Sequence, residues 1–225
     1  MADDPDPEDR IPLLANAALM PAFRGADVEG ILSEIASLIG TNADRNLVAA
    51  LRDASGAAAL GAGRLDDAVV EYREAAELSA NAGATDDRLL AARAAFWGGN
   101  AQGAAAELVE IEVSGYRAPA VDARTATIRA GLAASEGRRA EALGLYRDAL
   151  RRWRDLGMVW DEVLTSIDMA TLLDPAEPEV RAAAASAREV LARLGAKPFL
   201  ARLDAAMERQ ASTAMAEPVG PRYPT

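Results

Sequence analysis

The sequence GRLDDAVVEYREAAEL at residues 63–78 decides the fold class of this chain. A turn glycine opens it, and small and aromatic residues then recur at the spacing of an α-helix. A second copy, GRRAEALGLYRDAL, occupies residues 137–150. The residues at matching offsets are Ala68, Tyr72 and Ala75 in the first copy and Ala142, Tyr146 and Ala149 in the second. Two matching helices so far apart in the chain predict a repeat protein.

The turn positions give the length of the repeat. They are Gly25, Gly63, Gly99, Gly137 and Pro175, separated by steps of 38, 36, 38 and 38 residues. The positions five residues after these turns are Gly30, Ala68, Ala104, Ala142 and Val180. The positions seven residues before them are Ala18, Gly56, Ala92 and Ala130, and Asp168 in the last repeat. Small residues at both places allow helices to cross closely, so we expect stacked helix pairs with an irregular last pair.

The composition favours helices. Hydrophobic residues make up 51% of the 225 residues, many of them alanine, and aromatic residues only 4%. Alanine is the strongest helix former and lets helix backbones approach closely. Alternating strand patterns are absent from the sequence, and β-branched runs are few. We therefore predict an all-α protein.

The chain divides into three regions. We expect a disordered acidic N-terminus at residues 1–10, a helical domain at residues 11–210 and a flexible tail at residues 211–225. Pro21 predicts a kink or an early stop in the first helix. Gly83 is expected to end the helix that contains the first signature sequence, with Thr85 as the N-cap of the next helix.

The residue types exclude several classes of function. The sequence has no cysteine and no histidine, which removes disulfides, thiolate nucleophiles, the usual zinc sites and every His-based catalytic arrangement. A net charge of −11 repels a phosphate backbone and argues against nucleic-acid binding. The acidic start is unlike a signal peptide, and no stretch of about 18 apolar residues exists to span a membrane. We expect a cytoplasmic protein that does not bind membranes.

Charged clusters are the remaining candidates for chemistry. Glu107, Glu110 and Glu112 resemble paired catalytic carboxylates, but they lack partners for acid–base or metal chemistry. We therefore expect no enzyme, no catalytic residue, no cofactor and no metal site. A basic stretch consists of Arg138, Arg139, Arg147, Arg151, Arg152 and Arg154. It either docks an acidic partner or forms a solvated helix face with internal ion pairs.

The repeat resembles the tetratricopeptide repeat (TPR). Residues 63–78 match the second-helix pattern of that family, and Gly56 lies where its first-helix glycine belongs. The resemblance covers residues 11–195, although the repeats are nearer 37 than 34 residues long and lack the usual closing proline. It implies a right-handed superhelical stack of about five TPR-like hairpins plus a C-terminal capping helix. Long, divergent arrays of this kind are similar to the C-terminal arrays of large bacterial signalling ATPases, transcription regulators and adenylate cyclases.

The resemblance also implies a binding groove, because TPR arrays present the first helix of each pair on a concave face. The groove residues implied here are Asp53, Leu89, Arg93, Phe96, Trp97, Arg124 and Thr127. Arg93 and Trp97 share one helix face, where a cation–π contact or an aromatic anchor for a partner is expected to form. The alternative is that Phe96 and Trp97 fill the space between adjacent repeats.

Together these patterns favour a non-enzymatic module that binds a protein or peptide. The resemblance implies a regulatory or sensor part of a bacterial signalling or transcription-regulatory system. Two alternatives stay open at this point. One is a structural scaffold that forms a homo-oligomer, and the other is a C-terminal fragment of a multidomain ATPase or adenylate cyclase.

Overall fold

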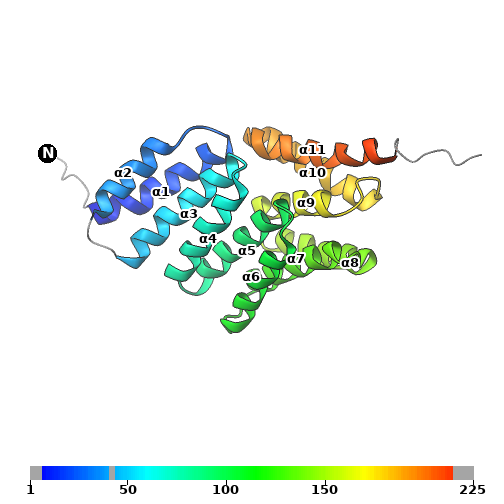
Figure 1. Cartoon of the computed structure of the whole chain (residues 1–225), viewed down its shortest axis with the longest axis horizontal. Coiled ribbons are helices and arrows are strands. Elements are labelled where there is room, and N and C mark those ends of the chain that lie inside the picture. The colour runs from blue at the N-terminus through cyan, green and yellow to red at the C-terminus, as the bar shows by residue number, and fades with distance from the viewer. Residues whose placement is uncertain (1–6, 41–43, 215–225) are drawn as a thin grey trace, which may run out of the picture.

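The computed structural model describes residues 7–40 and 44–214, and these residues form eleven helices and no strand (Figure 1). The helices are α1 (Pro7–Phe23), α2 (Glu29–Ile39), α3 (Arg45–Gly61), α4 (Leu65–Leu78), α5 (Asn81–Trp97), α6 (Ala101–Val113), α7 (Pro119–Ser135), α8 (Arg139–Asp155), α9 (Val159–Leu172), α10 (Pro178–Leu194) and α11 (Lys197–Ala214). The prediction of an all-α protein is confirmed.

Four of the predicted repeat turns share one backbone conformation. Gly25, Gly63, Gly99 and Gly137 have φ values of 79, 74, 79 and 76°, in the left-handed region that glycine adopts without a steric penalty. At each turn, the amide after the glycine donates to the carbonyl five residues earlier; the bond from Arg64 to Ala59 measures 2.9 Å. This bond closes the end of a helix. The spacing of these glycines therefore marks four equivalent helix ends.

The helices form a bent row. Each helix packs on the next one along the chain, and contacts also join α1 with α3, α5 with α7, and α5 and α7 with α9. The row turns back on itself, so that α11 lies beside its beginning (Figure 1). There Arg24 Nε donates to the carbonyl of Leu194, 170 residues away, at 2.8 Å. Contacts between the two ends of the row therefore close the fold.

The small residues of the repeat lie at helix crossings, as predicted. The fully buried residues at repeat positions include Ala18, Ala68, Ala92, Ala104, Ala130, Ala142 and Val180, together with Tyr72 and Tyr146. Gly56 lies under the Tyr72 ring, where a Cβ would come within 2.8 Å of the aromatic carbons. Gly30 is the exception, because it is exposed and has no atom within 4 Å of a Cβ position. The α2 helix is therefore less tightly packed at this position than its counterparts.

The predicted start and end of the helical domain are wrong. The α1 helix begins at Pro7 and includes residues 7–10, which were predicted to be disordered, and it continues through Pro21 to Phe23. Pro21 deprives only the carbonyl of Ala17 of its helical partner, and Ala17 is exposed, where water can replace the lost bond. The α11 helix extends to Ala214, so residues 211–214 of the predicted flexible tail are helical. The rest of both predicted segments lies outside the described residues.

The boundary between α4 and α5 also differs from the prediction. The α4 helix ends at Leu78 because Ser79 adopts an extended conformation with φ −82° and ψ 170°. Gly83 and Thr85 consequently lie inside α5 and neither ends nor caps a helix. The Thr85 hydroxyl instead donates to the Ala82 carbonyl at 2.8 Å. The extended conformation of Ser79, and not the predicted glycine and N-cap signals, sets the boundary between the two helices.

Candidate functional site

The predicted groove residues gather on one interior face formed by α3, α5 and α7. Six of the seven are buried, with exposed fractions of 2% for Leu89, 1% for Arg93, 5% for Phe96, 8% for Trp97, 3% for Arg124 and 2% for Thr127. The seventh, Asp53, is half-buried. Most of the predicted groove residues are therefore covered by other parts of the same chain.

An ion pair between α5 and α9 occupies the centre of this face. Arg93 Nε donates to both carboxylate oxygens of Asp168, at 3.1 and 2.9 Å, and Trp97 Nε1 donates to Asp168 Oδ1 at 2.8 Å. The expected cation–π contact between Arg93 and Trp97 is replaced by this carboxylate. The cation above the Trp97 ring is Arg202 of α11, at 4.6 Å from the ring centroid. Asp168 thus fixes both predicted groove side chains.

Burial sets the electrostatics of this ion pair. It raises the pKa of Asp168, while the Arg93 guanidinium and the Trp97 N–H act in the opposite direction. The two terminal nitrogens of Arg93 have no hydrogen-bond partner among the described residues. Asp168 is therefore the hydrogen-bonded counter-ion of this guanidinium, and Arg93 also interacts electrostatically with Asp161.

Aromatic side chains fill the space beside the ion pair. Phe199 of α11 packs edge-on against Trp97, Phe23 and Trp160, with centroid distances of 6.1, 5.5 and 5.2 Å. Phe23 and Trp160 are stacked at 4.8 Å. Phe199 is 1% exposed. Helices α1, α5, α9 and α11 therefore share one aromatic core, in which Trp97 is a packing residue.

The two α7 residues of the predicted groove also have internal partners. Arg124 forms an ion pair with Asp86 and donates to Thr85 Oγ1 at 3.0 Å. Thr127 Oγ1 donates to the Ala123 carbonyl at 2.9 Å and accepts from Trp153 Nε1 at 3.2 Å. These bonds join α7 to α5 and α8 and leave neither side chain facing an open groove.

One end of the predicted groove stays open. A cleft of about 420 Å³ lies between α3, the start of α5 and the residues before α5; its lining includes Asn46, Ala50, Asp53, Ser79, Asp86 and Asp87. Asp53 and Asp87 are joined by a side-chain hydrogen bond. Burial raises the pKa of Asp87 to about 8, and the nearby charge of Asp53 contributes the second-largest part of this increase. At neutral pH the two carboxyl groups therefore share one proton in an acidic cleft.

This shared proton predicts that stability falls as the pH rises. Folded Asp87 holds its proton up to about pH 8, whereas the unfolded chain releases it near the usual value of 3.8. Since the folded state binds more protons between these values, raising the pH from 5 to 9 should lower the free energy of unfolding by about 1–3 kcal/mol. Urea denaturation at both pH values measures this loss. The Asp87→Asn variant should lose markedly less, and an equal loss in the variant would contradict the shared proton.

The sequence analysis did not assign Asp87 and Asp168 to a site. Asp168 was visible as the single acid at a repeat position that is otherwise small, within the apolar run SIDMATLL. A buried acid in such a run needs a buried cation as its partner. Arg93, the only basic residue in the apolar run AARAAFW, could have been identified as that cation. Asp87 gave no comparable signal, because its pairing with Asp53 depends on the packing of α3 against the start of α5.

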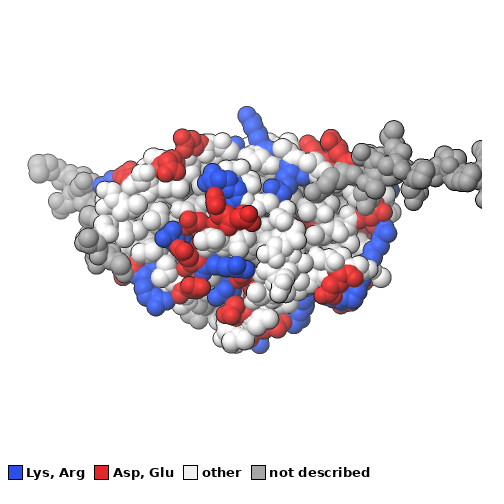
Figure 2. Space-filling model, viewed as in Figure 1, with Lys and Arg blue, Asp and Glu red and all other residues white. Residues whose placement is uncertain are grey.

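The other charged clusters have structural partners. Glu107 is 2% exposed and accepts from Arg88 at 2.8 Å and also from Arg73. Glu112 pairs with Arg129 at 2.7 Å. Every arginine of the predicted basic stretch, residues 138–154, forms an ion pair with an acid of the chain. Figure 2 shows basic and acidic side chains interspersed over the visible face. The basic stretch fits the solvated, ion-paired alternative, whereas Glu107 is a buried ion-pair partner.

Comparison with known proteins finds no match to this chain among protein families, curated proteins or solved structures. In the part of the chain that the structure describes, no three acidic side chains are grouped as a metal ion would require. Across the same residues, every helix is too short or too polar to cross a bilayer.

Proposed function

We propose that this chain is a non-enzymatic binding module built as a right-handed superhelical stack of five TPR-like hairpins. The hairpins are α1–α2, α3–α4, α5–α6, α7–α8 and α9–α10, with α11 as the capping helix. The four equivalent turn glycines and the buried small residues support this assignment. A regulatory role in a bacterial signalling or transcription system is part of the proposal and rests on the resemblance of the sequence alone.

The ligand is a protein segment that carries a basic side chain. One observation carries this choice: the open end of the predicted groove is lined by Asp53, Asp86 and Asp87. An arginine or lysine in this cleft would replace the proton that Asp53 and Asp87 share. Because Asp87 ionises near pH 8, binding should be tighter at pH 9 than at pH 7.

The test uses a peptide of defined charge. We expect an acetylated and amidated Ala-Arg-Ala-Arg-Ala peptide to bind in a saturable manner, and the corresponding Glu peptide not to bind, in isothermal titration. The Asp53→Asn/Asp87→Asn variant should bind the Arg peptide about tenfold more weakly, a loss of about 1.4 kcal/mol. At neutral pH the Asp66→Asn variant removes the same single negative charge at an exposed α4 position. Equal weakening in both variants would reduce the effect to overall charge and overturn the proposed site.

A further inference from the structure

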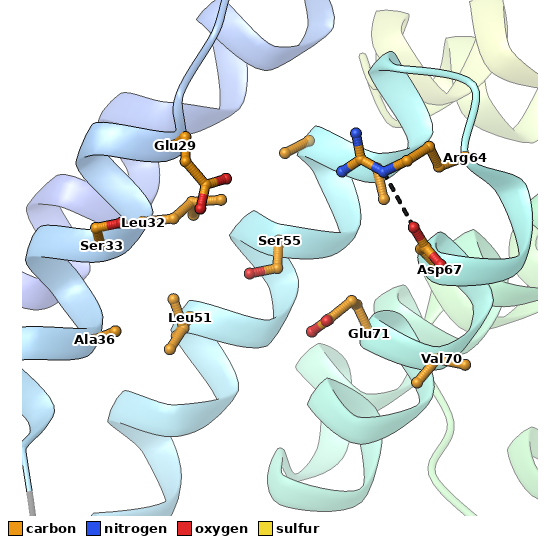
Figure 3. Close-up of a pocket in the computed structure, with 12 residues that line it drawn as sticks. Glu29, Leu32, Ser33, Ala36, Leu51, Ser55, Arg64, Asp67, Val70 and Glu71 are labelled. Carbon is orange, nitrogen blue, oxygen red and sulfur yellow. Dashed lines mark hydrogen bonds and ion pairs between the residues drawn. The ribbon is translucent and has the colours of Figure 1, made fainter.

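A second groove lies outside the predicted binding face. Helices α2, α3 and α4 line a space of about 430 Å³ (Figure 3). Its apolar part is formed by Leu32 and Ala36 of α2, Leu51 and Ala58 of α3, and Val70 of α4. Val70 is 53% exposed. The groove thus offers apolar contact area that the chain itself leaves uncovered.

Two of the other spaces along the row are bridged by ion pairs. Between α4 and α6, Arg73 pairs with Glu107. Between α8 and α10, Arg147 pairs with Glu179 at 2.8 Å. Arg73 and Arg147 occupy equivalent repeat positions, each directly after a signature tyrosine, whereas the equivalent position of α6 is Val109. Where this position is an arginine, it ties its helix to the next second helix.

The groove between α2 and α4 lacks this bridge. The α2 sequence EGILSEIASLI contains no basic residue, and the position equivalent to Arg73 is the buried Ile35. Glu29 of α2 and Asp67 and Glu71 of α4 instead place acids on both walls (Figure 3). Like charges on facing walls repel one another, so a cation placed between them would be attracted to both.

The two arginines near this groove do not neutralise its walls. Arg64 pairs with Asp67 at 3.1 Å within the first turn of α4. The Arg52 guanidinium forms ion pairs with both Glu71 and Glu74, at 3.1 and 2.9 Å. Glu29 forms no ion pair among the described residues. An acidic excess therefore remains beside the apolar floor.

We propose that the groove between α2 and α4 binds a short amphipathic helix of a partner protein, with arginine or lysine flanking its apolar face. The apolar residues of such a helix would cover Leu51 and Val70, and its basic residues would take the bridging place that Arg73 and Arg147 fill elsewhere. The α2 wall runs from Glu29 to Ala36, about 10 Å at 1.5 Å per residue, so about two helical turns would fill it. This site is separate from the acidic cleft proposed above and does not depend on it.

A designed helix is a suitable probe. It is an acetylated and amidated alanine-based peptide of about 14 residues, with leucine at i, i+3, i+4 and i+7 and arginine on both flanks of that face. We expect fluorescence anisotropy to show saturable binding, with the Glu-flanked version at least tenfold weaker. Similar affinity for both peptides, or no binding of the Arg-flanked peptide up to about 1 mM, would overturn the proposal.

Matched variants locate the binding. Val70→Lys should weaken binding of the Arg-flanked helix at least tenfold, because it places a positive charge among the apolar residues of the groove. Val109→Lys changes a residue of nearly equal exposure, 54%, on α6 outside the groove and should bind like the unchanged protein. The Asp53→Asn/Asp87→Asn variant should also bind normally, which separates this site from the acidic cleft. Equal binding by Val70→Lys would refute the site, and a dimer in light scattering that Val70→Lys abolishes would show that a second copy occupies it.

Discussion

The Asp168→Ala variant is expected to lose about 3–5 kcal/mol of unfolding free energy. Asp168 accepts two hydrogen bonds from Arg93 and one from Trp97, in a position where the Arg93 side chain is fully buried. Without the carboxylate, the buried guanidinium loses its hydrogen-bonded counter-ion and retains only the electrostatic interaction with Asp161, and the indole N–H loses its acceptor. Removal of one member of a buried ion pair is costly for this reason, even where the pair itself contributes little to stability.

Two further variants isolate the role of the pair. The Arg93→Met/Asp168→Leu double variant removes both charges and should recover most of the loss, because the desolvation cost of the pair also disappears. Asp155→Ala removes an exposed acid that pairs with Arg151 at 3.3 Å, and it should cost less than about 1 kcal/mol. Denaturant titration followed by tryptophan fluorescence measures all three. A loss for Asp168→Ala no larger than that for Asp155→Ala would contradict the buried ion pair.

The features predictable from the sequence are local ones. Gly63 and Gly137 mark helix ends because a left-handed glycine and its hydrogen bond involve residues within a few positions of each other. The burial of Ala68 and Ala142 follows from the packing of neighbouring helices. The same reasoning failed at Gly83, where a glycine that often ends helices lies inside α5, because Ser79 had already separated the two helices.

The curvature of the row was not predictable. It is the sum of small rotations between successive helices, which a repeat pattern does not specify. This curvature brings Asp168 to Arg93, 75 residues apart, and places α11 against Trp97 and Phe23. For the same reason the sequence did not indicate that most of the predicted groove residues are covered by other parts of the same chain. The cleft beside Asp53 and Asp87 is open.

The contact between the first two repeats predicts a second large effect, in the Gly61→Ala variant. A Cβ at Gly61 would lie 2.3 Å from the Ala22 carbonyl oxygen and 3.1 Å from the carbonyl carbon. Both atoms belong to the α1 backbone, which cannot rotate away as a side chain would. The end of α1 must therefore move from α3, and we expect a loss of about 3 kcal/mol of unfolding free energy.

The matched control is Gly144→Ala in α8. Gly144 is an exposed helical glycine with no atom within 4 Å of its Cβ position, so alanine there should stabilise the protein by about 0.5–1 kcal/mol through helix propensity alone. The same substitution is thus expected to have opposite signs at two helical positions, and the difference reports the close approach of α1 to α3. Thermal and urea denaturation of the two variants measure it. A neutral or stabilising effect of Gly61→Ala would mean that α1 and α3 lie further apart than described. It would contradict the close contact of Gly61 with the Ala22 carbonyl.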